Sequence, residues 1–217
     1  MQCKGFLFDL DGTLVDSNAA VDRSWQSWCE RNNIDFLLAA KVYHGRPAGD
    51  TIKELLQDVS AEKIQQEILW LQNQESTDVE GVEALPGAIA FLQKANEMSI
   101  PWAIVTSGTL PVASARIKAA GIPAPLVLIT PERVKNGKPD PEPFIRGASE
   151  LGLMASDCVV FEDAPSGLNA GNASGAKTVA VLSQFEQNEL PRADGYIRSM
   201  AEITVNKTSN GVFELNV

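Results

Sequence analysis

Long hydrophobic runs are missing from this sequence of 217 residues. The apolar segments are short and interrupted by charge, and none approaches the roughly 18 consecutive apolar residues that indicate a membrane-spanning helix. Hydrophobic residues still make up 44% of the chain, which is enough to bury one substantial core, or one core and a small satellite. We therefore expect a soluble protein with one main domain and an insertion.

Cysteine is also scarce. The chain has three cysteines, Cys3, Cys29 and Cys158, and no CxxC pair, which argues against a redox or zinc site and for reduced, buried thiols. The N-terminus passes from Gly5 directly into the apolar run 6–8, which leaves no room for a signal peptide. These features predict a cytoplasmic protein.

Positive charge is in deficit. Eighteen Lys and Arg residues face 28 Asp and Glu residues, for a net charge of −10, and no stretch is rich in Lys or Arg. Such a field repels nucleic acid and anionic membranes, so neither is an expected partner. A substrate that carries phosphate needs a local positive element, and a metal ion held by some of the surplus carboxylates would supply it.

Short apolar runs alternate with amphipathic segments along most of the chain. This alternation is typical of an α/β fold, a Rossmann-like parallel sheet with helices on both faces. Proline near the start and glycine after the end of several amphipathic segments support the helices. The expected strands are 6–10, 102–105, 126–129, 158–161 and 178–182, and the expected helices are 86–98, 110–120, 141–151 and 165–174.

The segment from residue 15 to 82 breaks this alternation. It shows only amphipathic helical patterns, and Asp50 and Ser60 are plausible N-caps. We therefore predict an inserted all-helical domain at 15–82 and a core domain that holds the sheet at 1–14 and 83–217, with the two connections side by side as a hinge. The C-terminal runs 203–205 and 212–215 predict a small hairpin of unknown role.

Two aspartates follow the first expected strand. Asp9 and Asp11 lie two residues apart, so both project to the same side of the chain, and Gly12 permits a sharp turn. Ligands of open α/β sheets bind beyond the carboxyl ends of the strands. A plain acidic turn is the alternative. An EF-hand is excluded, because counting from Asp9 puts Leu14 at loop position six and Ala20 at position twelve.

Polar residues follow the other expected strands as well. Hydroxyls and backbone amides suited to phosphate come after the second strand, and a carboxylate pair suited to a hard cation comes after the fourth. A lysine stands in a loop stiffened by two prolines. These candidates are Thr106, Ser107 and Gly108 for phosphate, Lys138 for phosphate, and Glu162 and Asp163 for the metal.

The segment 8–14, Phe-Asp-Leu-Asp-Gly-Thr-Leu, followed by the residues just named, resembles the haloacid dehalogenase superfamily in all four of its motifs. The resemblance spans residues 6 to about 182. The helical insertion is similar to the cap of sugar phosphatases and β-phosphoglucomutases. The chain is most similar to the 2-deoxyglucose-6-phosphatase and glycerol-3-phosphatase type, which implies a small phosphorylated sugar or polyol as substrate. Separately from this resemblance, we expect the protein to be a monomer.

The resemblance also implies roles for the candidates. Asp9 would be the nucleophile that forms an aspartyl-phosphate, and Asp11 the general acid and then the general base. Mg²⁺ would be bound by Asp9, the backbone carbonyl of Asp11, Asp163 and, directly or through water, Glu162. Thr106, Ser107, Gly108 and Lys138 would hold the phosphate oxygens.

Two alternatives to hydrolysis stay open. The mutase relatives carry a cap histidine where this chain has Val21, which favours hydrolysis over internal phosphoryl transfer but leaves a β-phosphoglucomutase-type mutase as the enzymatic alternative. A non-catalytic, receiver-like module that only stores phosphate on Asp9 is the alternative from another class. Such modules have no cap and no general acid two residues after the acceptor.

The loop His44-Gly45-Arg46 contains the single histidine of the chain. Similar His-Gly loops in sugar-phosphate enzymes face the active site from the cap, so we expect Arg46 to contact substrate hydroxyls or phosphate. Closure of the cap would exclude water from the aspartyl intermediate. The alternative is a glycine that ends a helix, followed by a solvated arginine.

Overall fold

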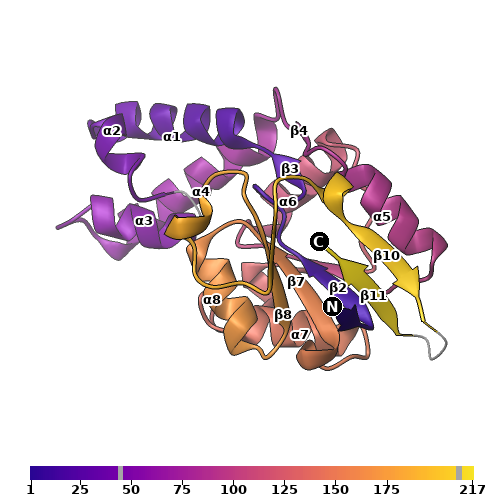
Figure 1. The fold of residues 1–217 in the computed structure, drawn as a ribbon. Coiled ribbons are helices and arrows are strands. Elements are labelled where there is room, and N and C mark those ends of the chain that lie inside the picture. Colours follow the sequence, from indigo (N-terminus) through magenta and orange to yellow (C-terminus); the bar gives the residue numbers. More distant parts are fainter. Residues whose placement is uncertain (44–45, 209–211) are drawn as a thin grey trace.

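The computed structural model describes residues 1–43, 46–208 and 212–217. Its centre is a six-stranded sheet in the order β6-β5-β2-β7-β8-β9, in which every neighbouring pair is parallel (Figure 1). The five predicted strands and the parallel α/β class are confirmed, whereas β9 was not predicted. The strands are β6 (Val127–Ile129), β5 (Trp102–Val105), β2 (Gly5–Phe8), β7 (Cys158–Glu162), β8 (Lys177–Val181) and β9 (Gly195–Ile197).

Strand β2 shows why the sheet is buried on both faces. Phe6 and Phe8 project to one face and Leu7 to the other, as the two-residue period of a strand requires, and all three are fully buried. Helices α7 and α8 cover the face of Leu7, and α5 and α6 cover the other. These helices are α5 (Ala88–Glu97), α6 (Leu110–Ala119), α7 (Glu142–Glu150) and α8 (Pro165–Ala173).

A small antiparallel sheet completes the face of Phe6 and Phe8. It consists of β1 (Gln2–Cys3), β11 (Phe213–Asn216) and β10 (Thr204–Lys207). The predicted C-terminal hairpin is thus confirmed and gains β1 as a third strand, while residues 209–211 lie outside the described part. The short 3₁₀ helices are η1 (Pro131–Arg133), η2 (Ala155–Asp157), η3 (Gln187–Glu189) and η4 (Met200–Glu202).

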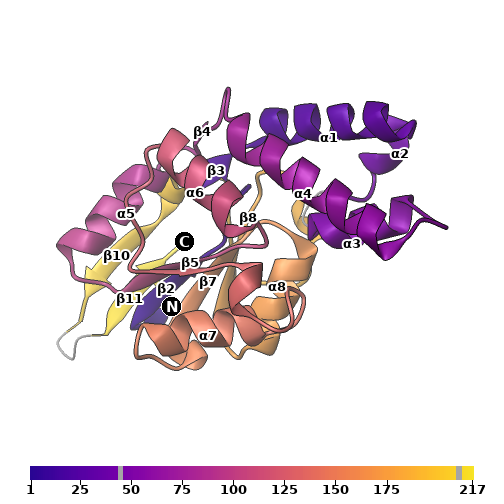
Figure 2. The ribbon, with the colours of Figure 1, turned by 180° about the vertical axis from the view of Figure 1, so that it is seen from behind.

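Helices α1 to α4 form a separate group beyond the carboxyl ends of the sheet strands (Figures 1 and 2). They bury their own cluster, in which the rings of Trp25 and Tyr43 stack 4.8 Å apart. The boundaries 14/15 and 82/83 of the predicted cap domain stay a prediction. The helices are α1 (Asn18–Asn32), α2 (Phe36–Ala39), α3 (Ala48–Leu55) and α4 (Ala61–Thr77).

The ends of this helical group follow local rules. The chain enters through β3 (Val15–Asp16) and leaves through β4 (Glu83–Ala84), and these two connections pair side by side. Ser60 caps α4, since its hydroxyl accepts a hydrogen bond from the Lys63 amide. The prediction that Asp50 is an N-cap was wrong: α3 begins earlier, after Pro47, and Asp50 lies in its first turn, where a carboxylate suits the helix dipole.

Within the described part of the chain, no helix is both long and apolar enough to cross a membrane.

Candidate active site

The register of the sheet brings the predicted chemistry together. Phe8 at the end of β2 pairs with Ile104 of β5 and Phe161 of β7. The residues that follow these three strands therefore emerge next to one another at the carboxyl edge of the sheet. Asp9 is the first of them, and its amide still donates to the Phe161 carbonyl at 2.9 Å.

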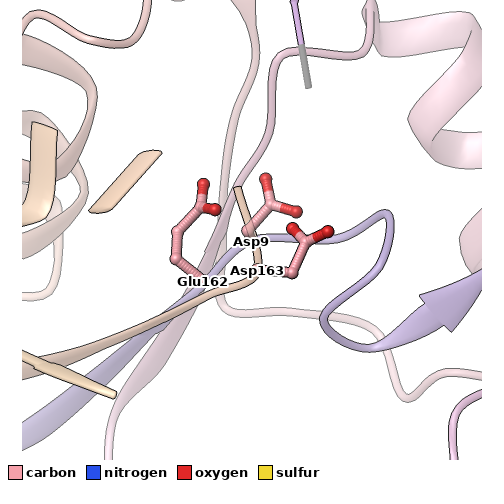
Figure 3. Close-up of side chains that lie close together, drawn as sticks. All are labelled: Asp9, Glu162 and Asp163. Atoms are coloured by element: carbon pink, nitrogen blue, oxygen red, sulfur yellow. The ribbon is translucent and has the colours of Figure 1, made fainter. Parts of the chain in front are cut away.

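Three carboxylates meet at this edge. Asp9, Glu162 and Asp163 are buried and each offers an oxygen within 4.8 Å of the others, and Figure 3 shows their side chains converging. Clustered carboxylate oxygens are the donors that a hard divalent cation such as Mg²⁺ takes. The residues present therefore fit the predicted metal. The Asp11 side chain is not in this cluster, so a contribution of Asp11 through its backbone carbonyl stays a prediction.

Lys138 lies among these carboxylates. Its Nζ donates to Asp9 Oδ1 at 2.5 Å, to Glu162 Oε1 at 2.7 Å and to the Val105 carbonyl at 2.8 Å, so its three hydrogens are all directed to protein oxygens. One ammonium among three carboxylates leaves a charge that one divalent cation would neutralise. The same ammonium is also placed to contact a phosphate that reaches Asp9.

The electrostatics of the cluster reflect this crowding. Burial raises the pKa of Asp9 to about 8, with Lys138 acting against the rise and Glu162 adding to it. Burial and the charges of Glu162 and Asp9 also raise the pKa of Asp163. Burial lowers the pKa of Lys138, but the charges of Asp9 and Glu162 outweigh this effect and the net direction is upward. A bound cation would favour the ionised carboxylates.

Two glycines leave room for the cluster. Gly12 has a positive φ of 85°, and a Cβ there would overlap the Asp163 carboxylate. Gly167 on α8 is in contact with Glu162, whose carboxylate a Cβ would also overlap. The second oxygen of Glu162 accepts from the Ala164 amide at 2.9 Å. The backbone thus sets the direction of both metal-ligand candidates.

Asp11 is held by different partners. Ser17 donates to its Oδ1 at 2.7 Å, and Arg116 of α6 lies 3.0 Å from its Oδ2. The same guanidinium lies 3.2 Å from Glu75 of α4. Both Asp11 oxygens are therefore engaged by side chains, one at the connection to the helical group and one on the core helix beneath it.

A cavity of about 330 Å³ opens over these groups, a size within the range of small-molecule sites. Asp9, Asp11, Lys138 and the segment 106–108 line it from the core. In that segment the Thr106 hydroxyl accepts from the Gly108 amide at 2.9 Å. The helical group closes the opposite side with residues that include Val21, Trp25, Tyr43, Arg46, Gln72 and Glu75.

The predicted cap loop is only partly described. His44 and Gly45 lie outside the described residues. Arg46 lines the cavity, and its guanidinium is 2.8 Å from Glu54 on α3. Val21 also lines the cavity, at the position where mutase relatives would carry histidine. The role of this loop in binding substrate stays a prediction.

Sequence reasoning missed Arg116, Glu75 and Ser17. Arg116 is 5% exposed, which is rare for arginine. Its position in the apolar pattern of the helix 110–119 was the available signal, because Val112 and Ala113, four and three residues earlier, lie on the same buried side. Nothing in the sequence, however, joins Arg116 to Glu75, which are 41 residues apart in the chain.

Comparison with known proteins places the chain among hydrolases. Residues 6–181 match the family model described as haloacid dehalogenase-like hydrolase. The chain is 47% identical to hexitol phosphatase A of Escherichia coli (strain K12) over 97% of its own length and 98% of that protein. It is 30% identical to 2-deoxyglucose-6-phosphate phosphatase 2 of Saccharomyces cerevisiae over 95% of its length and 92% of the relative.

A solved structure gives the same result for the fold. The crystal structure of a hydrolase from Pseudomonas syringae superposes with a TM-score of 0.78 at 26% identity, over 90% of this chain and 93% of the other. The resemblance to phosphatases that act on sugar phosphates, stated from the motifs, is confirmed by the family model and by the two phosphatase relatives.

Proposed function

Because the chain belongs to the haloacid dehalogenase-like hydrolase family, we propose that it is a Mg²⁺-dependent phosphatase that hydrolyses the monoester of a small phosphorylated sugar or polyol. The observation that carries this proposal is the meeting of Asp9, Glu162, Asp163 and Lys138 at the floor of a cavity. The identity of 47% to a hexitol phosphatase makes hexitol monophosphates the first substrates to test.

In the proposed reaction an Asp9 oxygen attacks phosphorus and the bond from phosphorus to the leaving oxygen breaks. Asp11 gives its proton to that oxygen, since a polyol alkoxide is too basic to leave unprotonated. In the second half, Asp11 takes a proton from a water whose oxygen attacks the aspartyl-phosphate and frees Asp9. When bound, Mg²⁺ held by Asp9, Glu162 and Asp163 would offset the repulsion between carboxylate and phosphate.

The other site residues would act on the phosphate and the polyol. On the core side, Lys138, the Thr106 hydroxyl and the amides of Ser107 and Gly108 would donate to the phosphate oxygens. Lys138 and the Gly108 amide would then exchange protein oxygens to which they now donate for oxygens of the phosphate. Arg46 and the neighbouring His44-Gly45 loop would act from the helical group, on hydroxyls or phosphate. A cytoplasmic location and a monomeric state remain predictions from the sequence.

The mutase alternative is weaker. Val21, which lines the cavity, cannot exchange a proton with a substrate hydroxyl. The receiver-like alternative is also weaker, because the chain matches two phosphatases over nearly their whole length. In addition, Asp11 lies two residues after the phosphate acceptor Asp9, which is the spacing expected for a general acid. Conversion between sugar phosphate isomers would support the first alternative, and long-lived phosphorylation without turnover would support the second.

The test is release of inorganic phosphate from a panel of hexitol, hexose and glycerol monophosphates, with Mg²⁺ and with EDTA. We expect activity that EDTA abolishes. Asp9→Asn should lose all measurable turnover, and Asp11→Asn should lower kcat roughly 10²- to 10⁴-fold, the usual contribution of general acid-base catalysis. Turnover retained by Asp9→Asn would disprove the nucleophile assignment.

A further inference from the structure

Arg116 is a buried charge for which the proposed reaction has no role. It stands on α6 with 5% of its surface exposed and lines the cavity. Its two terminal nitrogens approach carboxylates of different elements, Asp11 Oδ2 at 3.0 Å and Glu75 Oε1 at 3.2 Å. The buried Nε–H has no acceptor among the described residues. Among the described residues, the two carboxylates are the groups that hold this guanidinium in place.

The two carboxylates belong to parts of the molecule that meet only in the folded state. Asp11 follows β2 in the core, and Glu75 stands near the end of α4 in the helical group. Helices α4 and α6 pack against each other, as Figure 2 shows. Because the planar guanidinium of arginine holds its donors in a rigid fork, the position of one carboxylate limits the orientation offered to the other.

We propose that Arg116 is a positioning residue that orients the Asp11 carboxylate for proton transfer, and that Glu75 makes this orientation depend on the seating of α4 against α6. The inference rests on the acid and base role proposed for Asp11. The helical group would then influence the proton transfer by Asp11 in addition to limiting the access of water. The orientation would be lost when α4 moves away from α6.

A purely structural ion pair explains these contacts less well. A buried pair of charges contributes little stability compared with apolar residues of similar size, and α4 and α6 could pack through such residues. Arg116 instead reaches the carboxylate that lies two residues after Asp9 and completes its coordination, because Ser17 already donates to the other oxygen at 2.7 Å.

The test uses two substrates whose leaving groups differ in basicity. A hexitol phosphate needs a proton from Asp11 for phosphorylation of Asp9, whereas p-nitrophenyl phosphate releases a weakly basic phenolate without it. Both need Asp11 as the base for hydrolysis of the aspartyl-phosphate. For Arg116→Met we expect kcat on the hexitol phosphate to fall roughly 10- to 100-fold, part of the full effect of general acid-base catalysis, with KM changed less than about threefold.

Rapid mixing separates positioning from loss of structure. With p-nitrophenyl phosphate, Arg116→Met should release a burst of about one equivalent of p-nitrophenolate before a slow steady state, because only the second step is impaired. The hexitol phosphate should give no burst. Equal losses on both substrates without a burst, a raised KM at unchanged kcat, or a kcat within about threefold of the unmodified protein would each overturn the proposal.

Glu75→Gln tests the connection to the helical group. We expect the same split between substrates with a smaller loss, and the double variant with Arg116→Met should lose no more than Arg116→Met alone, since the two residues act in series. Additive losses, or no effect of Glu75→Gln, would remove Glu75 from the proposal. Arg23→Met is the control, because Arg23 pairs with Asp78 at 2.7 Å and should keep both activities.

Failure of this inference differs from failure of the proposed function. If the unmodified protein releases no phosphate from any sugar or polyol phosphate, or if Asp9→Asn still does, the proposed function fails. If those results are as expected and Arg116→Met lacks the split between the two substrates, only the positioning role is rejected.

Discussion

Gly12 leaves the space in which the Asp163 carboxylate of the acidic cluster lies. Its backbone has a φ of 85°, which residues with a Cβ rarely adopt. The space that a Cβ would fill is occupied by the Asp163 carboxylate. Gly81 has a similar φ of 76°, but apart from its chain neighbours no atom of the described residues lies within 4 Å of the corresponding position. A substitution at Gly81 would therefore cause backbone strain alone, whereas the same substitution at Gly12 would also displace the metal-ligand candidate Asp163.

For Gly12→Ala we expect kcat/KM to fall roughly 100-fold, the cost of misplacing a reacting group by about 1 Å, with weaker binding of Mg²⁺ in calorimetric titration. Gly81→Ala should lower the free energy of unfolding by roughly 1 kcal/mol, because its only cost is the strain of a residue with a Cβ in the left-handed conformation. Its activity should stay unchanged. Equal kinetic losses in the two variants would show that strain alone explains the effect.

At the scale of elements, helix α4 connects the fold of the helical group to the site. It begins at the cap residue Ser60, buries Leu71 completely and presents Glu75 to Arg116. Most helical stability comes from such packing, while the cap stabilises the first turn. Loss of the cap should therefore loosen the start of α4 without removing any group that lines the cavity.

Ser60→Ala should lower the free energy of unfolding in urea by about 1 kcal/mol, since the Lys63 amide loses its acceptor. Ser76→Ala is the matched control within the same helix. Its hydroxyl donates back to the Asn73 carbonyl at 3.1 Å, a bond within the last turn that contributes little to helix stability. A loss as large for Ser76→Ala as for Ser60→Ala would contradict the capping role.

At the scale of the whole molecule, folding collects carboxylates that the unfolded chain keeps apart. The pKa of Asp9 rises from 3.8 to about 8, so between these values the folded metal-free protein keeps a proton that the unfolded chain has lost. The contribution of this proton to the free energy of unfolding is therefore fully present at pH values below the lower pKa, and it is lost as the pH rises toward the higher pKa. Mg²⁺, which binds the ionised carboxylates, should stabilise the protein most at the upper end of this window.

We therefore expect Asp9→Asn to stabilise the metal-free protein more at about pH 8 than at about pH 5, by a difference of about 1–3 kcal/mol. Urea unfolding in EDTA at both pH values measures it. If the free energy of unfolding of the two proteins changed equally with pH, folding would not raise the pKa of Asp9 in this way.

Most of the sheet could be predicted from the sequence, because strands such as 102–105 and 158–161 are unbroken runs of buried apolar residues that are rich in β-branched and aromatic side chains. β9 could not, since its three residues, Gly-Tyr-Ile, are too few for a pattern. The pair β3 and β4 has only two residues in each strand. Asp50 was mistaken for a cap because a carboxylate is favourable both at the N-cap and one turn later.

The sequence by itself determined the α/β class, the resemblance to phosphatases, and the positions of Asp9, Asp11, Glu162 and Asp163 at or just after the ends of their strands. These features are local, since the strand period and the chemistry of each short motif do not depend on distant residues. Only the tertiary structure decided that Arg116 joins Asp11 to Glu75. That contact depends on how α4 packs on α6, and helix packing depends on the surfaces of both helices together.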